Sequence, residues 1–181
     1  ISKYNVGGLC FFQGSADIQA KLTNEYQQLS KYPLLISMDA EFGLGMRLKS
    51  DGFSFPKQLT LGAIQNNHLI YDTGLNMASH LKRMGVHLNF APVLDINNNP
   101  SNPVINERSF GENKLNVTSK SYLFMQGLQD GGVMACAKHF PGHGDTDTDS
   151  HLSLPVVNAS PERLDSLELF PFMKLIPQGL A

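Results

Sequence analysis

Four short apolar segments alternate along the chain with amphipathic helical patterns, and this order constrains the fold more than any other feature. The apolar segments are continuous rather than interrupted by polar residues, which is typical of strands buried on both faces of a parallel sheet. A sheet of this kind is covered by helices or rolled into a barrel. The predicted strands cover residues 6–12, 34–38, 88–94 and 133–140.

The segments between these strands carry apolar residues at spacings of three and four, which predicts helices over about residues 15–29, 70–84 and 115–130. A further helix starts at Ser160, where the Ser-Pro-Glu run supplies an N-cap, a proline in the first turn and an early acidic side chain. Pro171 should break or kink that helix, because proline cannot continue the helical hydrogen bonding.

The composition excludes several functional classes. Apolar residues make up 41% of the 181 residues and charged residues 17%, which indicates a globular chain rather than a disordered one. With 14 basic and 16 acidic side chains the net charge is −2, so nucleic acid and anionic membrane surfaces are not expected partners. The longest apolar runs are too short to span a bilayer. No phosphate-binding loop or dinucleotide-binding glycine motif follows a predicted strand.

Cysteine usage and the first residue carry less information. Cys10 and Cys136 lie within predicted strands and have no CxxC partner, so we expect buried free thiols. The chain starts at Ile1 rather than at a methionine, from which we expect an excerpt or a processed product. The compartment is left open: cytoplasmic, or periplasmic or extracellular if a signal segment precedes Ile1.

Three of the four predicted strands end in charged or polar side chains. Asp39 ends the second strand, Asp95 the third, and Lys138 and His139 lie at the end of the fourth. One such residue alone would be read as a helix cap or a loop brace. Charged groups at the ends of several buried strands are costly without partners or a ligand, so together they predict a site at the open face of a barrel.

The loop over residues 138–155 (KHFPGHGDTDTDSHLSLP) is the most informative stretch, and two metal interpretations of it are weak. Three alternating aspartates imitate the start of a calcium loop, but Ser150 replaces the required glycine and Val156 the bidentate glutamate. His139 and His143 have the spacing of a helical zinc motif, but the Pro-Gly pair between them breaks such a helix. We therefore expect no metal.

Acid–base catalysis is the third interpretation of this loop. His151 follows Asp149 by two residues, and in an extended segment both side chains point the same way. The carboxylate would then fix the imidazole tautomer and raise its basicity. We expect this pair to move protons.

These residues carry a family resemblance. The histidine loop resembles the signature of the β-N-acetylglucosaminidase branch of glycoside hydrolase family 3, and three further motifs match in order. Phe42 and Leu44 depart from the Glu-Gly-Gly run that is common in the family. The four motifs are MDAEFG (38–43), NFAPVLD (89–95), NERSFG (106–111) and KHFPGHGDTDTDSH (138–151).

The resemblance implies the fold and the extent of the domain. The catalytic domain of this family is a (β/α)₈ barrel or a variant of it, and residues 1–181 would be part of that N-terminal domain. Four predicted strands correspond to about half a barrel, roughly strands 2 to 5 of eight. Because half a barrel leaves strand edges open, we expect a longer chain of at least ~300 residues.

The resemblance also implies roles for individual residues. His151 would be the general acid/base on a mobile loop, with Asp149 as its dyad partner, and Asp95 would brace the site. No cofactor is implied. The side chains implied to hydrogen-bond the terminal sugar are Asp39, Arg108, Lys138 and His139.

The implied reaction is retaining double displacement that removes terminal β-linked N-acetylglucosamine, with peptidoglycan-derived sugars as substrates. No residue after His151 fits the family's attacking aspartate, since Asp165 belongs to a helix start, so we expect the nucleophile beyond Ala181. Alternatives are a β-glucosidase-type member of the family, a phosphorylase, and a carbohydrate-binding relic without the nucleophile. The oligomeric state is not indicated.

Overall fold

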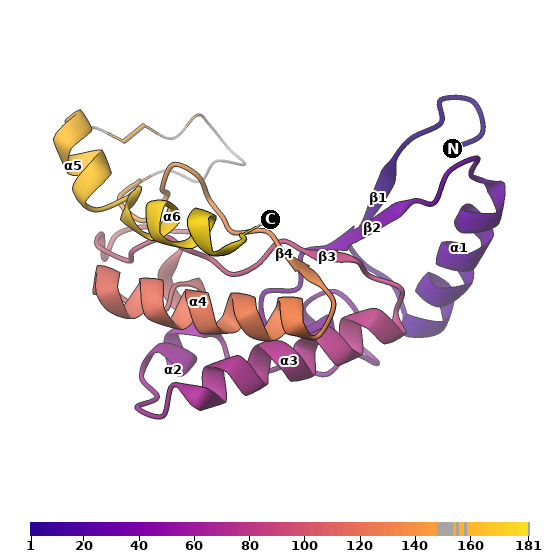
Figure 1. Ribbon diagram of the computed structural model, residues 1–181, viewed down its shortest axis with the longest axis horizontal. Helices are drawn as coiled ribbons and strands as arrows, with labels where there is room; N and C mark the ends of the chain where they lie inside the picture. The colour runs from indigo at the N-terminus through magenta and orange to yellow at the C-terminus, as the bar shows by residue number, and fades with distance from the viewer. Residues whose placement is uncertain (148–153, 155, 158, 181) are drawn as a thin grey trace.

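The computed structural model describes residues 1–147, 154, 156–157 and 159–180, and in this part the strands form one parallel sheet in the order β1-β2-β3-β4 (Figure 1). Helices connect successive strands, which confirms the predicted α/β architecture of a partial barrel. The strands are β1 (Gly8–Phe11), β2 (Leu35–Met38), β3 (Leu88–Asn89) and β4 (Met134–Ala135). The helices are α1 (Ala16–Leu29), α2 (Gln58–Gly62), α3 (His68–Arg83), α4 (Lys114–Asp130), α5 (Pro161–Ser166) and α6 (Phe170–Leu175).

The last two strands are shorter than predicted. Pro92 has no N–H to donate to a neighbouring strand, and β3 ends before it. Parallel pairing resumes further on as an isolated bridge between Val93 and Lys138, where the Leu94 N–H donates to the Lys138 carbonyl at 2.6 Å. The chain thus stays in the sheet direction up to the polar residues that follow.

The prediction that the first strand is buried is wrong. β1 lies at the edge of the sheet, and none of its residues is fully buried. The Cys10 thiol is exposed for the same reason, and Cys136 is partly buried. Burial, the larger influence, raises the pKa of the Cys136 thiol, while the charge of Lys138 opposes this.

Helices α3 and α4 run side by side and form much of the core (Figure 1). The predicted apolar face of α3 is buried, including Ile70 and Leu81. Gly74 of α3 and Gly127 of α4 lie where the helix backbones approach each other: a Cβ built on Gly127 would meet the Tyr71 carbonyl oxygen at 2.2 Å. The two glycines therefore let the helices pack closely.

The remaining helices follow local capping rules. The Ser160 hydroxyl accepts a hydrogen bond from the Arg163 N–H, which confirms the predicted start of α5. The helix is interrupted before Pro171, as predicted: α5 ends at Ser166, and α6 begins at Phe170 with Pro171 in its first turn. The segment 40–62 contains the short helix α2. No helix in the described part of the chain is long and apolar enough to cross a membrane.

Candidate active site

The polar side chains at the strand ends meet around one cavity of about 270 Å³. All four side chains predicted to contact the sugar line it. Asp39 follows β2, Arg108 closes a 3-10 turn in the loop between β3 and α4, and Lys138 and His139 follow β4. The carboxyl ends of parallel strands share one edge of a sheet, so residues distant in sequence converge there. The lining residues are Asp39, Phe90, Val104, Arg108, Lys138, His139 and His143.

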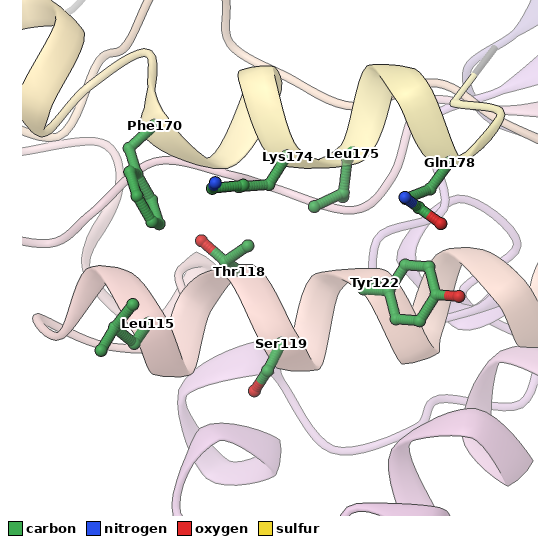
Figure 2. A pocket seen from close by; sticks show the side chains of 8 residues that line it. All are labelled: Leu115, Thr118, Ser119, Tyr122, Phe170, Lys174, Leu175 and Gln178. Atoms are coloured by element: carbon green, nitrogen blue, oxygen red, sulfur yellow. The ribbon is translucent and has the colours of Figure 1, made fainter.

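A larger hollow of about 590 Å³ lies between α4 and α6, but its chemistry differs (Figure 2). Figure 2 shows Leu115 and Tyr122 of α4 facing Phe170 and Leu175 of α6. Lys174 is the charged member of the lining. Its walls offer no carboxylate, so the strand-end cavity is the better candidate for catalysis.

Asp39 is held from two sides. The Arg47 guanidinium donates from Nη2 to Asp39 Oδ2 at 2.7 Å and from Nε to the Asp39 carbonyl at 2.8 Å. The Lys138 ammonium forms an ion pair with the other carboxylate oxygen. These contacts fix the Asp39 carboxylate, while about a fifth of the side chain remains exposed to accept a further hydrogen bond.

Glu41 is the functional residue that the sequence interpretation missed. Its side chain is 2% exposed and accepts two hydrogen bonds from Arg108, Nε at 2.9 Å and Nη2 at 2.7 Å. Lys138 Nζ lies 2.7 Å from the same carboxylate. One buried acid therefore holds both cations of the cavity. The sequence did indicate it in one way: Glu41 lies two residues after Asp39, at the acid-rich end of the same strand.

The electrostatics of Glu41 follow from this position. Burial is the largest single influence and raises its pKa, but the hydrogen bonds and charges of Arg108 and Lys138 together outweigh burial and lower the pKa to about 2. For Arg108, burial again acts first and lowers the pKa, yet the contacts with Glu41 raise it overall. Both groups are therefore charged throughout the physiological range.

Asp95 braces His139, as predicted. Its buried carboxylate accepts from His139 Nδ1 at 2.6 Å and from the His139 peptide N–H at 3.2 Å. On the other ring edge, Arg108 Nη2 lies 3.2 Å from His139 Nε2. Because a guanidinium can only donate, Nε2 must carry the lone pair and Nδ1 the proton.

The start of the histidine loop is anchored by side chains from neighbouring segments. Asn102, which is 2% exposed, donates from Nδ2 to the His143 carbonyl at 2.7 Å. Arg163 of α5 pairs with Asp145 at 2.8 Å and with Glu168 at 3.1 Å. The loop is therefore fixed up to the last residues before position 148.

The structure also bears on the metal interpretations. The rings of His139 and His143 lie edge to face with centroids 5.7 Å apart, and their Nδ1 atoms contact Asp95 and Thr146. Within residues 1–147 and the described parts that follow, no group of three or more His, Cys, Asp or Glu side chains is placed to hold a metal ion.

The proposed dyad is not tested by this geometry. Asp149 and His151 lie outside the described residues, so their predicted contact stays a prediction. Asp165 is exposed on α5 and is not among the residues that line the cavity.

Comparisons with known proteins agree with the motifs. The model of the glycosyl hydrolase family 3 N-terminal domain matches residues 1–181. Beta-hexosaminidase A from Pseudoalteromonas piscicida is 38% identical over an alignment that covers 99% of this chain and 33% of that protein. A glycoside hydrolase family 3 β-N-acetylglucosaminidase from Paenibacillus sp. str. FPU-7 superposes with a TM-score of 0.92 at 43% identity, covering 99% of this chain and 36% of that one.

A further solved structure carries a sugar ligand. NagZ from Neisseria gonorrhoeae, in complex with N-trifluoroacetyl-D-glucosamine, superposes with a TM-score of 0.86 at 31% identity. The match covers 97% of this chain and 54% of the NagZ chain. Across these three proteins, the chain spans between a third and about half of the relative's length.

Proposed function

The chain belongs to glycosyl hydrolase family 3, and from this premise we propose that it supplies the sugar-binding part of a β-N-acetylhexosaminidase that removes terminal β-linked N-acetylglucosamine. The observation that carries the proposal is the convergence of Asp39, Arg108, Lys138 and His139 on one cavity. The names of the relatives, a beta-hexosaminidase and a β-N-acetylglucosaminidase, support the same substrate class.

The cavity suits an uncharged sugar. Arg108 and Lys138 provide donors, and Asp39 provides an acceptor. Glu41 and Asp39 balance the two cations through ion pairs. A balanced site does not demand a charged ligand, but its fixed donors and acceptors match the hydroxyl groups of a pyranose. Peptidoglycan-derived sugars would present such a terminal residue.

The acid–base step is assigned to the histidine loop. In our proposal His151 protonates the glycosidic oxygen as the leaving group departs, and Asp149 orients its imidazole. In the second half of the reaction His151 takes a proton from the attacking water, which completes a retaining double displacement.

The nucleophile is proposed to come from a segment outside these 181 residues. Each acid at or beside the cavity is already engaged: Asp39 by Arg47 and Lys138, and Glu41 by Arg108. A carboxylate held by cations is a poor nucleophile, because its charge is stabilised in the ground state. The greater length of the relatives leaves room for a further acid.

A panel of aryl glycosides tests the substrate class. The full-length protein that contains this chain is assayed on the aryl N-acetylglucosaminide, glucoside and xyloside. We expect kcat/KM to be at least about tenfold higher for the N-acetylglucosaminide. Preference for the glucoside would favour the β-glucosidase-type alternative, and sugar binding without turnover would favour the relic.

The His151→Ala variant tests the acid–base assignment. We expect turnover to fall by about 10²–10⁴ for substrates with poor leaving groups and much less for activated aryl glycosides, which need no proton. Equal losses on both would contradict the assignment. Repeating the wild-type assay with inorganic phosphate, and looking for the sugar phosphate, tests the phosphorylase alternative.

A further inference from the structure

His143 is buried beside the sugar cavity with one ring nitrogen unused. The residue is 6% exposed and lines the cavity together with Arg108 and His139. Its Nε2 atom has no hydrogen-bond partner among the described residues. Native proteins seldom leave a buried polar atom unsatisfied, because it has lost its water without replacement. Because Nε2 has almost no accessible surface, a ligand in the adjoining cavity becomes its partner by displacing the atoms that cover it.

The ring of His143 is fixed by its other contacts. Its peptide N–H donates to Asp95 Oδ1 at 2.6 Å, and its Nδ1 contacts the Thr146 hydroxyl. The Asn102 amide holds its carbonyl at 2.7 Å. These three contacts set the position of Nε2 before any ligand arrives, and such preorganisation favours binding.

The hydrogen bonds around Thr146 also indicate the tautomer. The Thr146 hydroxyl, which has a single proton, lies 3.0 Å from the His143 carbonyl and donates to it. The close contact with Nδ1 must then use the imidazole proton, with the hydroxyl oxygen as acceptor. Asn102 Nδ2 also approaches this oxygen as a donor, at 3.4 Å. In a neutral imidazole with this hydrogen-bond pattern, Nε2 carries the lone pair.

We propose that Nε2 of His143 accepts a hydrogen bond from one hydroxyl group of the terminal sugar and so contributes to substrate specificity. The inference rests on the proposed function of the cavity. Arg108 and Lys138 can only donate hydrogen bonds, whereas the terminal sugar has several hydroxyl protons to donate. These protons need an acceptor in addition to Asp39. A sugar that lacks this hydroxyl would leave Nε2 unsatisfied and would bind more weakly.

Two substitutions separate the two edges of the ring. His143→Asn keeps a polar group near Nδ1 and its contact with Thr146, but removes the group at Nε2. His143→Gln instead places its amide near Nε2. In the full-length protein we expect the inhibition constant of N-acetylglucosamine to rise about tenfold in the Asn variant and to stay within about threefold of wild type in the Gln variant.

The opposite order, or equal effects in both variants, would show that His143 acts through Thr146 as a structural residue and would overturn the inference. Thermal unfolding of both variants checks that each is folded under the assay conditions. If the wild-type protein cleaves no aryl glycoside and binds no N-acetylglucosamine, the proposed function fails. If the wild-type protein cleaves its substrate but the inhibition constant rises more in the Gln variant than in the Asn variant, only the role of His143 is refuted.

Deoxy sugars identify the hydroxyl. The 3-, 4- and 6-deoxy analogues of N-acetylglucosamine are compared as inhibitors of wild type and of the His143→Asn variant, as a double-mutant cycle. We expect one analogue to bind wild type and the His143→Asn variant with inhibition constants within about twofold of each other. This analogue lacks the hydroxyl group that contacts Nε2, so losing Nε2 costs it no further hydrogen bond. The same tenfold loss for all three analogues would contradict a direct hydrogen bond.

Discussion

At the level of single residues, Glu41 organises the cavity without lining it. Its carboxylate receives Arg108 through two nitrogen atoms and also contacts Lys138, while the cavity wall itself contains Asp39. A bidentate guanidinium–carboxylate pair fixes direction as well as charge. Glu41 is therefore a positioning residue, which holds the two cations where they would meet the sugar.

The Glu41→Gln variant tests this role. A neutral amide removes the carboxylate that binds Arg108 and one of the two that bind Lys138. We therefore expect kcat/KM to fall about 100-fold, with a large part of the loss in KM. The matched control is Glu107→Gln, because Glu107 pairs with Lys57 on an exposed surface and its side chain is 57% exposed. Steady-state kinetics of both variants decide the matter: a Glu41 variant as active as the Glu107 control would refute the positioning role.

The low pKa of Glu41 predicts a pH dependence of stability. The folded-state pKa of about 2 lies below the ordinary value of 4.5, so the folded protein favours the ionised form. This contribution of roughly 2–4 kcal/mol is fully present above pH ~4.5 and is lost as the pH falls toward the folded pKa. Protonation of the buried acid removes the carboxylate that binds Arg108 and leaves Lys138 paired with Asp39.

Urea unfolding of wild type and Glu41→Gln at pH 6 and pH 3 measures the effect. We expect the difference in free energy of unfolding between the two proteins to narrow by about half at pH 3. A difference that does not change with pH would show that the wild-type acid does not titrate with folding.

At the level of elements, the sequence predicts helices better than strands. The helical spacing predicts residues 70–84, and α3 spans His68–Arg83 with Ile70 and Leu81 buried. The strand prediction relied on apolar runs alone, and these continue past Asn89 although Pro92 interrupts the hydrogen-bonded pairing. An apolar run shows that a segment is buried, not how far its ladder extends.

The contact between α3 and α4 predicts that a glycine-to-alanine substitution in a helix lowers the free energy of unfolding, although such a substitution usually raises it. Alanine normally stabilises a helix interior by about 1 kcal/mol relative to glycine. A Cβ at Gly127 would instead lie 2.2 Å from the Tyr71 carbonyl oxygen and force the helices apart. We expect Gly127→Ala to lower the free energy of unfolding by about 2–3 kcal/mol.

Gly7→Ala is the control for this test, because a Cβ at Gly7 meets no atom within 4 Å. Denaturant unfolding of both variants should show near wild-type stability for Gly7→Ala alone. A stabilised Gly127→Ala variant would mean that the two helices do not pack through their glycines.

At the level of the whole molecule, the parallel topology explains why the strand-end residues of the site could be predicted from the sequence. Polar residues at the ends of successive strands must lie near each other when all strands point the same way, and so Asp39, Asp95 and His139 were found. Partner choice could not be predicted in the same way. Asp95 binds the His143 peptide N–H, and Glu41 takes both cations, through contacts between segments far apart in sequence.

The order of the strands in the sheet is also consistent with the longer chains of the relatives. Within the described residues, β1 and β4 each pair with a neighbour on one side. In a closed barrel every strand has two neighbours. The chain covers 36% of the Paenibacillus enzyme and 54% of NagZ, which agrees with a part of a barrel.

The most direct test of the central claim is a crystal structure of the full-length protein with N-acetylglucosamine bound. The account predicts that the sugar occupies the strand-end cavity, with its hydroxyl groups within hydrogen-bond distance of Asp39, Arg108, Lys138 and His139. A sugar bound elsewhere, with this cavity filled only by water, would contradict it.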